Sequence, residues 1–266
     1  MANLPQQVVE PFNRLKDCRH GKMLYNFHDQ YVGRSLDLYG EYSEAEFELF
    51  RQIVRPGDVV VEVGANLGAH TIPLAKLTGS HGAVIAYEPQ RVVYQTLCAN
   101  VALNDLIHVF TNHAAVGTVP GVLNVPILDP TQDQNFGGYS MMGHPEGESV
   151  PLVILDALNL VGCRLLKVDV EGMELDVLQG AANLIRAFHP AMYVENDRSD
   201  RTAELTQFIA SLGYDMFSHD PPLFNPNNYF NNPENVFGKI VSRNLFCVPQ
   251  QVSHMITGLP RVEPVT

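Results

Sequence analysis

Short apolar runs rich in β-branched residues recur along the chain, separated by segments with helical apolar spacing. The runs have the length and composition of buried strands. They are residues 59–63, 83–87, 107–110, 165–170, 191–195, 214–218 and 244–248. The helical segments carry apolar residues three or four positions apart and begin near residues 43, 67, 90, 174 and 200. This alternation predicts an α/β domain.

The run at 59–63 leads into a glycine-containing loop and then a helix. Gly64 and Gly68 allow a tight loop, and glycine is needed where a ligand approaches the backbone too closely for a Cβ atom. Strand, glycine loop and helix in this order open nucleotide-binding α/β units. The motif alone also occurs in proteins that bind no nucleotide, so the residues around it decide its meaning.

The residues around the loop narrow the chemical class of ligand that it can bind. No Gly-Lys-Ser/Thr follows, which excludes a triphosphate loop. Asn66 stands where a dinucleotide motif has its middle glycine, and Glu62 at the strand end repels phosphate but suits an ammonium group. Glu88 and Pro89 end the second strand, where an acid accepts hydrogen bonds from ribose hydroxyls. A ligand with a ribose, a cationic amino-acid part and no phosphate is S-adenosylmethionine (SAM).

At this point the sequence resembles the FkbM-type family of SAM-dependent methyltransferases. The matching stretches are residues 62–68, 87–89 and 166–174, and the resemblance covers roughly residues 55–250. It implies a Rossmann-like class I methyltransferase fold, with a seven-stranded, mostly parallel sheet that includes an antiparallel strand and has helices on both faces. It also implies O-methylation of a hydroxyl on a small molecule or sugar.

Three other functions remain possible beside O-methylation by an FkbM-type enzyme. N-methylation of an amine or peptide would use the same cofactor. A catalytically silent SAM-binding module would keep the fold without the chemistry, although the acids described next argue against it. An NAD enzyme would need the third glycine that the loop lacks, and Glu62 also argues against it.

Acidic residues gather at the ends of the fourth and fifth strands. Lys167 and Asp169 are two positions apart and point to one face, and Glu171 points the same way. Glu195 ends the fifth strand. Because open α/β sheets bind ligands at the carboxyl ends of their strands, we take Asp169, Glu171 and Glu195 as catalytic candidates. Two other roles stay open: the three acids bind Mg²⁺, or Lys167 pairs with Asp169 or Glu171 only to hold the strand end.

The candidate cofactor contacts lie along the ends of the first four strands. Asn112 joins them because it ends the third strand, near the expected position of the adenine. The candidates are Glu62, Gly64, Ala65, Asn66, Gly68, Glu88, Pro89, Asn112 and Asp169.

The remaining segments predict the organisation around one domain at 43–250, with an N-terminal extension at 1–42 and a loosely ordered C-terminal tail at 251–266. In the extension we expect short strands at 25–27 and 35–38, and aromatic residues that cover a sheet edge rather than the cofactor. Ser43 and Glu46 have the spacing of a capping box.

Three irregular stretches are expected within the domain. Residues 116–128 read as a hairpin around Pro120 and Gly121. Residues 129–148 form a candidate acceptor-side lid or an ordinary insertion, with Gly137 and Gly138 as a hinge. A loop rich in Asn and Pro, residues 219–239, separates the last two strands, and Ser199 or Asp200 caps the helix before them.

Composition adds limits on partners and location. The chain has 266 residues, 45% hydrophobic content and a net charge of −12, which disfavours nucleic acid as the acceptor. Four scattered cysteines suggest buried free thiols and no zinc site. No leader or membrane-length apolar run is present in this sequence. We therefore expect a cytoplasmic protein that acts on a small molecule or sugar and does not bind a membrane.

Overall fold

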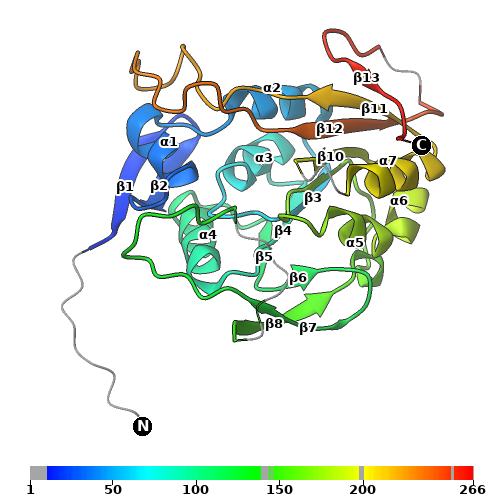
Figure 1. The fold of residues 1–266 in the computed structure, drawn as a ribbon, viewed down its shortest axis with the longest axis horizontal. Helices are drawn as coiled ribbons and strands as arrows, with labels where there is room; N and C mark the ends of the chain where they lie inside the picture. Colours follow the sequence, from blue (N-terminus) through cyan, green and yellow to red (C-terminus); the bar gives the residue numbers. More distant parts are fainter. Residues whose placement is uncertain (1–10, 139–143, 145, 198–200, 253–254, 266) are drawn as a thin grey trace.

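The computed structural model describes residues 11–138, 144, 146–197, 201–252 and 255–265, and a twisted sheet runs through its centre (Figure 1). The strand order is β13-β11-β12-β10-β9-β3-β4-β5. The strands are β3 (Val59–Val63), β4 (Ala83–Tyr87), β5 (Val109–Asn112), β9 (Leu165–Val168), β10 (Ala191–Glu195), β11 (Tyr214–His219), β12 (Asn244–Pro249) and β13 (Arg261–Val262). All seven predicted strands are present, with β5 shifted two residues toward the C-terminus.

Parallel pairing joins the five strands from β10 to β5, and β12 runs antiparallel to both β10 and β11. This is the predicted Rossmann-like class I methyltransferase fold. The two-residue strand β13 adds an eighth, antiparallel strand at the β11 edge. The expectation of a loosely ordered tail was therefore wrong at residues 261–262.

Helices cover both faces of the sheet. They are α2 (Glu44–Ile53), α3 (Thr71–Thr78), α4 (Arg91–Leu103), α5 (Glu174–Gln179), α6 (Ala182–Phe188) and α7 (Thr202–Ser211). Because side chains alternate along a strand, Val60 packs with Phe50 and Leu74 on the face of α2 and α3. Its neighbour Val61 packs with Leu178 on the face of α5, α6 and α7.

The periodicity from residue 174 to 185 predicts one helix, but the structure has two, α5 and α6. Gly180 lies between them, and a Cβ atom there would meet the carbonyl oxygen of Gly117 at 2.0 Å. This close approach requires glycine and interrupts the helix. The predicted cap of α7, Ser199 or Asp200, lies outside the described residues.

The predicted hairpin at 116–128 is also wrong. Strands β6 (Ala115–Val116) and β7 (Gly121–Val125) do not pair with each other, because β8 (Glu148–Val153) lies between them. The partner of both strands, β8, comes after the whole stretch that was read as a hairpin, and local turn residues carry no information about it. A 3₁₀ turn, Leu155–Ala157, then leads toward β9.

Residues 11–42 form the hairpin of β1 (Asn13–Cys18) and β2 (Gly21–Asn26), followed by α1 (Val32–Tyr39). The expected strand at 35–38 is therefore helical. The loop between β11 and β12 lies beside α1 (Figure 1), where Tyr39 packs with Leu223 and Phe237. The buried carboxylate of Glu41, which is 4% exposed, connects the two segments. It accepts hydrogen bonds from Arg19 Nε, Asn225 Nδ2 and the Tyr229 amide at 2.6, 2.7 and 2.8 Å.

Removing the Glu41 carboxylate is expected to weaken the contact between the N-terminal region and the β11–β12 loop. Glu41→Ala should lower the free energy of unfolding by about 2–3 kcal/mol, because hydrogen bonds to a charged group are lost and their donors are left unpaired. Urea denaturation measures the change. Glu48→Ala is the control: it removes an exposed ion pair with Arg51 and should cost less than about 1 kcal/mol. Equal losses in the two variants would contradict this role of Glu41.

Candidate active site

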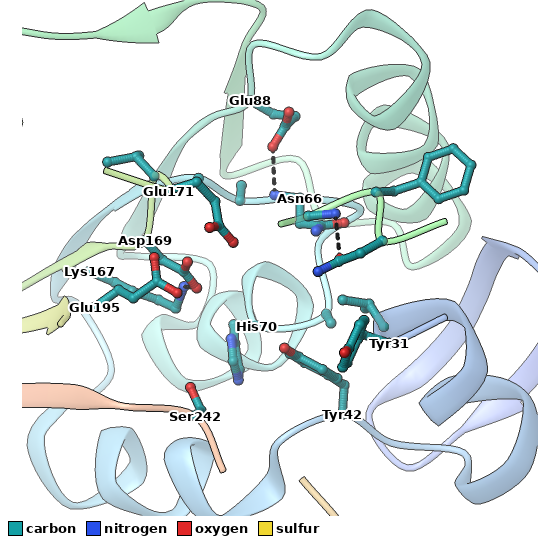
Figure 2. Close-up of a pocket in the computed structure, with 18 of the residues that line it drawn as sticks. Tyr31, Tyr42, Asn66, His70, Glu88, Lys167, Asp169, Glu171, Glu195 and Ser242 are labelled. Carbon is teal, nitrogen blue, oxygen red and sulfur yellow. Dashed lines mark hydrogen bonds and ion pairs between the residues drawn. The ribbon is translucent and has the colours of Figure 1, made fainter. Parts of the chain in front are cut away.

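A cleft opens at the carboxyl ends of β3, β4, β9 and β10, where an open α/β sheet places its ligands. It measures about 250 Å³, whereas two other cavities measure about 20 and 10 Å³. Figure 2 shows Glu88 at one end, the acids Asp169, Glu171 and Glu195 along one side, and Tyr31 and Tyr42 at the other end. This cleft is the best candidate for a small-molecule site.

The glycine loop brings the ends of β3 and β9 together. Gly64 has φ +82°, and a Cβ atom there would lie 1.7 Å from the carbonyl oxygen of Asp169. Ala65 and Asn66 follow and line the cleft. Gly68 does not line it: this residue, at φ +94°, lets the loop pack against Leu97 of α4. Gly64 is therefore required by backbone packing and also borders the ligand space.

Glu88 is a nearly buried carboxylate, 6% exposed, at the tip of β4. Its two oxygens accept hydrogen bonds from the backbone amides of Asn66 and Gln90, at 2.9 and 2.8 Å. Burial raises the pKa of Glu88 to about 7, although both hydrogen bonds act in the opposite direction. Each oxygen keeps a lone pair for a further donor. Pro89 lines the cleft next to it.

Asn112 is placed differently from the expectation. It is not among the cleft residues, its carbonyl accepts a hydrogen bond from the Glu88 amide, and its side-chain amide donates to the carbonyls of Ala86 and Phe110. Asn112 therefore supports the backbone that carries Glu88. A ligand contact from its side chain is not supported in this arrangement.

The three catalytic candidates do come together. Asp169, Glu171 and Glu195 each offer an oxygen, and these oxygens lie within 4.8 Å of one another. Burial first, and then the neighbouring charges of Asp169 and Glu171, raise the pKa of Glu195 well above its ordinary value. Its Oε2 atom has no hydrogen-bond partner among the described residues. Glu195 is thus a carboxyl of raised basicity with one oxygen left for a further partner.

Lys167 lies beneath the cluster and is 2% exposed. Its Nζ is 3.2 Å from Asp169 Oδ2 and 4.0 Å from Glu62 Oε1, so the predicted pair with Asp169 is formed. Burial alone would lower the pKa of Lys167, but the charges of Asp169, Glu62 and Glu46 outweigh it and raise the pKa. Lys167 therefore stays charged and holds Asp169 in place.

Glu62 was expected to face the ammonium group of a ligand. It does line the cleft, but the ammonium beside it is that of Lys167, and its Oε2 accepts a hydrogen bond from Thr71 Oγ1 at 2.6 Å. Burial raises the pKa of Glu62 to about 7, while Lys167 acts against the rise. The carboxylate thus connects β3 to the first turn of α3.

Sequence reasoning missed Glu46. Ser43 precedes α2 as predicted, but its hydroxyl bonds the Glu46 carboxylate at 2.8 Å and makes no capping bond, so the capping box was wrong. Glu46 is 3% exposed and acts electrostatically on Lys167. Glu46, Phe50 and Ile53 share one buried helical stripe, and an acid in such a stripe was an available signal.

The far wall of the cleft was missed as well. It combines Tyr31 and Tyr42 of the N-terminal region, His70 before α3, and residues 240–242 of the β11–β12 loop. The aromatic residues were expected to cover a sheet edge and not the cofactor site, but Tyr31 and Tyr42 line the cleft. Tyr25 and Tyr39 are buried in hydrophobic clusters. Only tertiary packing brings these distant segments together.

The stretch 129–148 also reaches the cleft. Asn135, Phe136 and Gly137 line it, and Gln134 is held to the backbone of His28 and Gln30 by two hydrogen bonds. Residues 139–143 and 145 of the candidate lid lie outside the described residues. The part that is described is docked on the N-terminal region.

None of the described helices has the length and apolarity needed to cross a bilayer.

Comparison with known proteins identifies the family of the chain and some of its relatives. A family profile, the methyltransferase FkbM domain, matches residues 62–216. Methyltransferase 1 of Beauveria bassiana is 27% identical over 143 residues, which are 46% of this chain and 57% of that protein. The chain thus matches little more than half the length of this relative.

Solved structures were compared as well. A methyltransferase FkbM from Methylobacillus flagellatus aligns with a TM-score of 0.48 at 19% identity, over 82% of this chain and 55% of its own. A SAM-dependent O-methyltransferase from Thermotoga maritima aligns with a TM-score of 0.47 at 14% identity, over 91% and 79%. The profile match covers more than half of the sequence. The chain therefore belongs to the FkbM methyltransferase domain family.

Proposed function

We propose that this protein is a SAM-dependent methyltransferase that methylates a hydroxyl group of a small molecule or sugar. The observation that carries the proposal is the position of Glu88 and of the cluster of Asp169, Glu171 and Glu195 on either side of one glycine loop. The first carboxylate suits a ribose and the cluster suits a reacting hydroxyl.

The residues present fit the cofactor. Gly64 leaves room for close approach at the end of β3, and Glu88 has lone pairs left for ribose hydroxyls. Asp169 and Glu62 place negative charge beside the space for a cationic amino-acid part. SAM supplies an activated methyl group when bound, so the protein has to supply positioning and electrostatics.

Within the cluster, the environments of the acids suggest different roles. Asp169 pairs with Lys167 at 3.2 Å and faces the reacting centre or the cofactor's methionine portion. Glu195, whose pKa is raised by burial and by its neighbours, is suited to take a proton from an acceptor hydroxyl. Glu171 orients the acceptor beside it.

The charge of the cleft restricts the acceptor class. Among the described residues, its lining contains the carboxylates of Glu62, Glu88, Asp169, Glu171, Glu195 and Asp197 and one permanently charged cation, Lys167. Phosphate groups and nucleic-acid backbones would be repelled by this lining. A neutral hydroxyl compound is favoured. A second candidate is N-methylation of an amine, because the same acidic lining attracts a cationic acceptor.

Calorimetry with SAM and with NAD tests the cofactor. SAM should bind and NAD should not, and Glu88→Ala should weaken SAM binding by about 1.5–3 kcal/mol through the loss of charged hydrogen bonds. Glu148→Ala, which removes the Arg91 ion pair outside the cleft, is the control and should leave SAM affinity unchanged. Tighter binding of NAD would exclude the proposed cofactor.

Turnover tests the catalytic cluster. A panel of hydroxyl and amine acceptors is screened with SAM carrying a labelled methyl group, with and without EDTA. Asp169→Asn should keep the fold by circular dichroism and lower turnover by about 10²- to 10⁴-fold. Full activity in this variant would assign Asp169 to structure alone.

The same screen tests two alternatives. Loss of activity in EDTA would support the Mg²⁺ role of the three acids, and absence of turnover with every acceptor would favour a silent binding module.

The affinity for SAM should also depend on pH. The pKa values of Glu62 and Glu88 are raised to about 7, so both lose their charge as the pH falls through 7. A cationic ligand favours the ionised forms, so SAM affinity should fall by up to about tenfold per proton between pH 7 and 6. Calorimetry over this range measures the change, and Glu88→Gln should flatten it. Affinity that rises on acidification would contradict this assignment.

A further inference from the structure

The methionine end of SAM carries an α-carboxylate as well as an ammonium group, and the acidic lining of the cleft leaves few places for that carboxylate. The inference below rests on the proposed function. An anion in a cleft with six carboxylates needs a hydrogen-bond donor that is free to turn toward it.

Lys167, the one permanently charged cation among the described lining residues, is already paired with acids. Lys167 is 2% exposed and lies between Asp169 and Glu62, with Glu46 also contributing to its field. Moving it toward a ligand would leave buried carboxylates without their counter-charge, which is costly. Lys167 therefore cannot serve the cofactor's carboxylate.

His70 and Ser242 are also unsuitable. Burial, and after it the charge of Lys167, keeps the pKa of His70 well below its ordinary value, and the ring donates a hydrogen bond to the backbone of Ser43. The neutral ring then presents a lone pair at Nε2, which is unpartnered among the described residues and repels an anion. The Ser242 hydroxyl is engaged with Glu46 and with Asn244 Nδ2.

Tyr42 differs from these residues. Figure 2 shows its hydroxyl pointing into the cleft, at the end opposite Glu88. Its ring packs on His70 with centroids 5.7 Å apart, and no hydrogen bond of its hydroxyl is found within the described part of the chain. Burial, and then the charges of Glu46 and Asp169, raise the pKa of Tyr42 well above its ordinary value, so the hydroxyl keeps its proton and acts as a donor.

The order of the residues along the cleft agrees with this role. With the ribose at Glu88, the methionine portion has to extend past the glycine loop toward Asp169 and the start of α3 at Thr71. Tyr42 lies across that space from the acids (Figure 2). The amino end of α3 is nearby and lowers the cost of an anion there.

We propose that the Tyr42 hydroxyl donates a hydrogen bond to the α-carboxylate of SAM, while the acids of the opposite wall face its ammonium group. Tyr42 is thereby a positioning residue for the cofactor, supplied by the segment that precedes α2. The cleft separates the two charges of the amino-acid head: the acidic wall takes the cation and the uncharged wall takes the anion.

Binding of SAM and of decarboxylated SAM, which lacks only this carboxylate, tests the proposal without an acceptor. Calorimetry on the full chain compares the wild type with Tyr42→Phe. The variant should bind SAM about tenfold or more weakly, as expected for a lost hydrogen bond to a charged group, and should bind decarboxylated SAM as the wild type does. Tyr39→Phe is the matched control. Its hydroxyl bonds Glu234 and Val236 outside the cleft, so it should change neither affinity.

The two ligands distinguish a hydrogen bond to the carboxylate from a general effect of Tyr42 on the cleft. Equal weakening for both ligands would mean that Tyr42 only shapes the cleft, and no weakening for SAM would also overturn the proposal. Loss of the preference for SAM in Tyr31→Phe, with Tyr42→Phe unaffected, would move the role to the neighbouring tyrosine and overturn it as well. A wild-type protein that binds neither ligand would overturn the proposed function itself, and circular dichroism of each variant checks that the fold is retained.

Discussion

The buried ammonium group of Lys167 is the constraint around which the cleft is built. It lies on β9 between Asp169 and Glu62, and the charge of Glu46 reaches it from α2. A buried charge is costly unless it is compensated, so β3, β9 and α2 have to meet at this point. Breaking this arrangement would leave three carboxylates facing one another at the floor of the site.

Above Lys167, two acids of the cleft have different surroundings. Asp169 is held by a cation, whereas Glu195 is buried beside other negative charges and has an oxygen without a partner among the described residues. Burial beside like charges raises the pKa of Glu195. The roles proposed for the two acids rest on this difference in their surroundings.

The opposite wall has another composition and another origin. Tyr31 and Tyr42 precede the sheet in the chain, while residues 240–242 come from the loop before its last long strand. Glu41 and the cluster of Tyr39, Leu223 and Phe237 fasten these segments to each other. The wall is uncharged, so the two sides of the cleft differ in polarity as well as in position. The sheet contributes the acids, and the added segments shape the space for the ligand.

The local pattern of the sequence determined the strands, the glycine loop and the acids at the strand ends, because each depends on neighbours within a few positions. Val59–Val63 has few alternatives to a buried strand, and an acid that directly follows such a strand must lie at the sheet's ligand edge. The pairing of Lys167 with Asp169 could be predicted for the same reason, because residues two positions apart along a strand point to the same face.

Tertiary structure alone decided which distant residues meet. Glu46 looked like part of a helix cap until α2 was packed on the sheet with that carboxylate turned toward Lys167. Asn112 had the right position in the chain, but hydrogen bonds to neighbouring carbonyls occupy its amide. Tyr42 and Ser242 line one cleft although 200 positions separate them. Such contacts follow from burial and from the compensation of charge across the whole fold, which no short stretch of sequence contains.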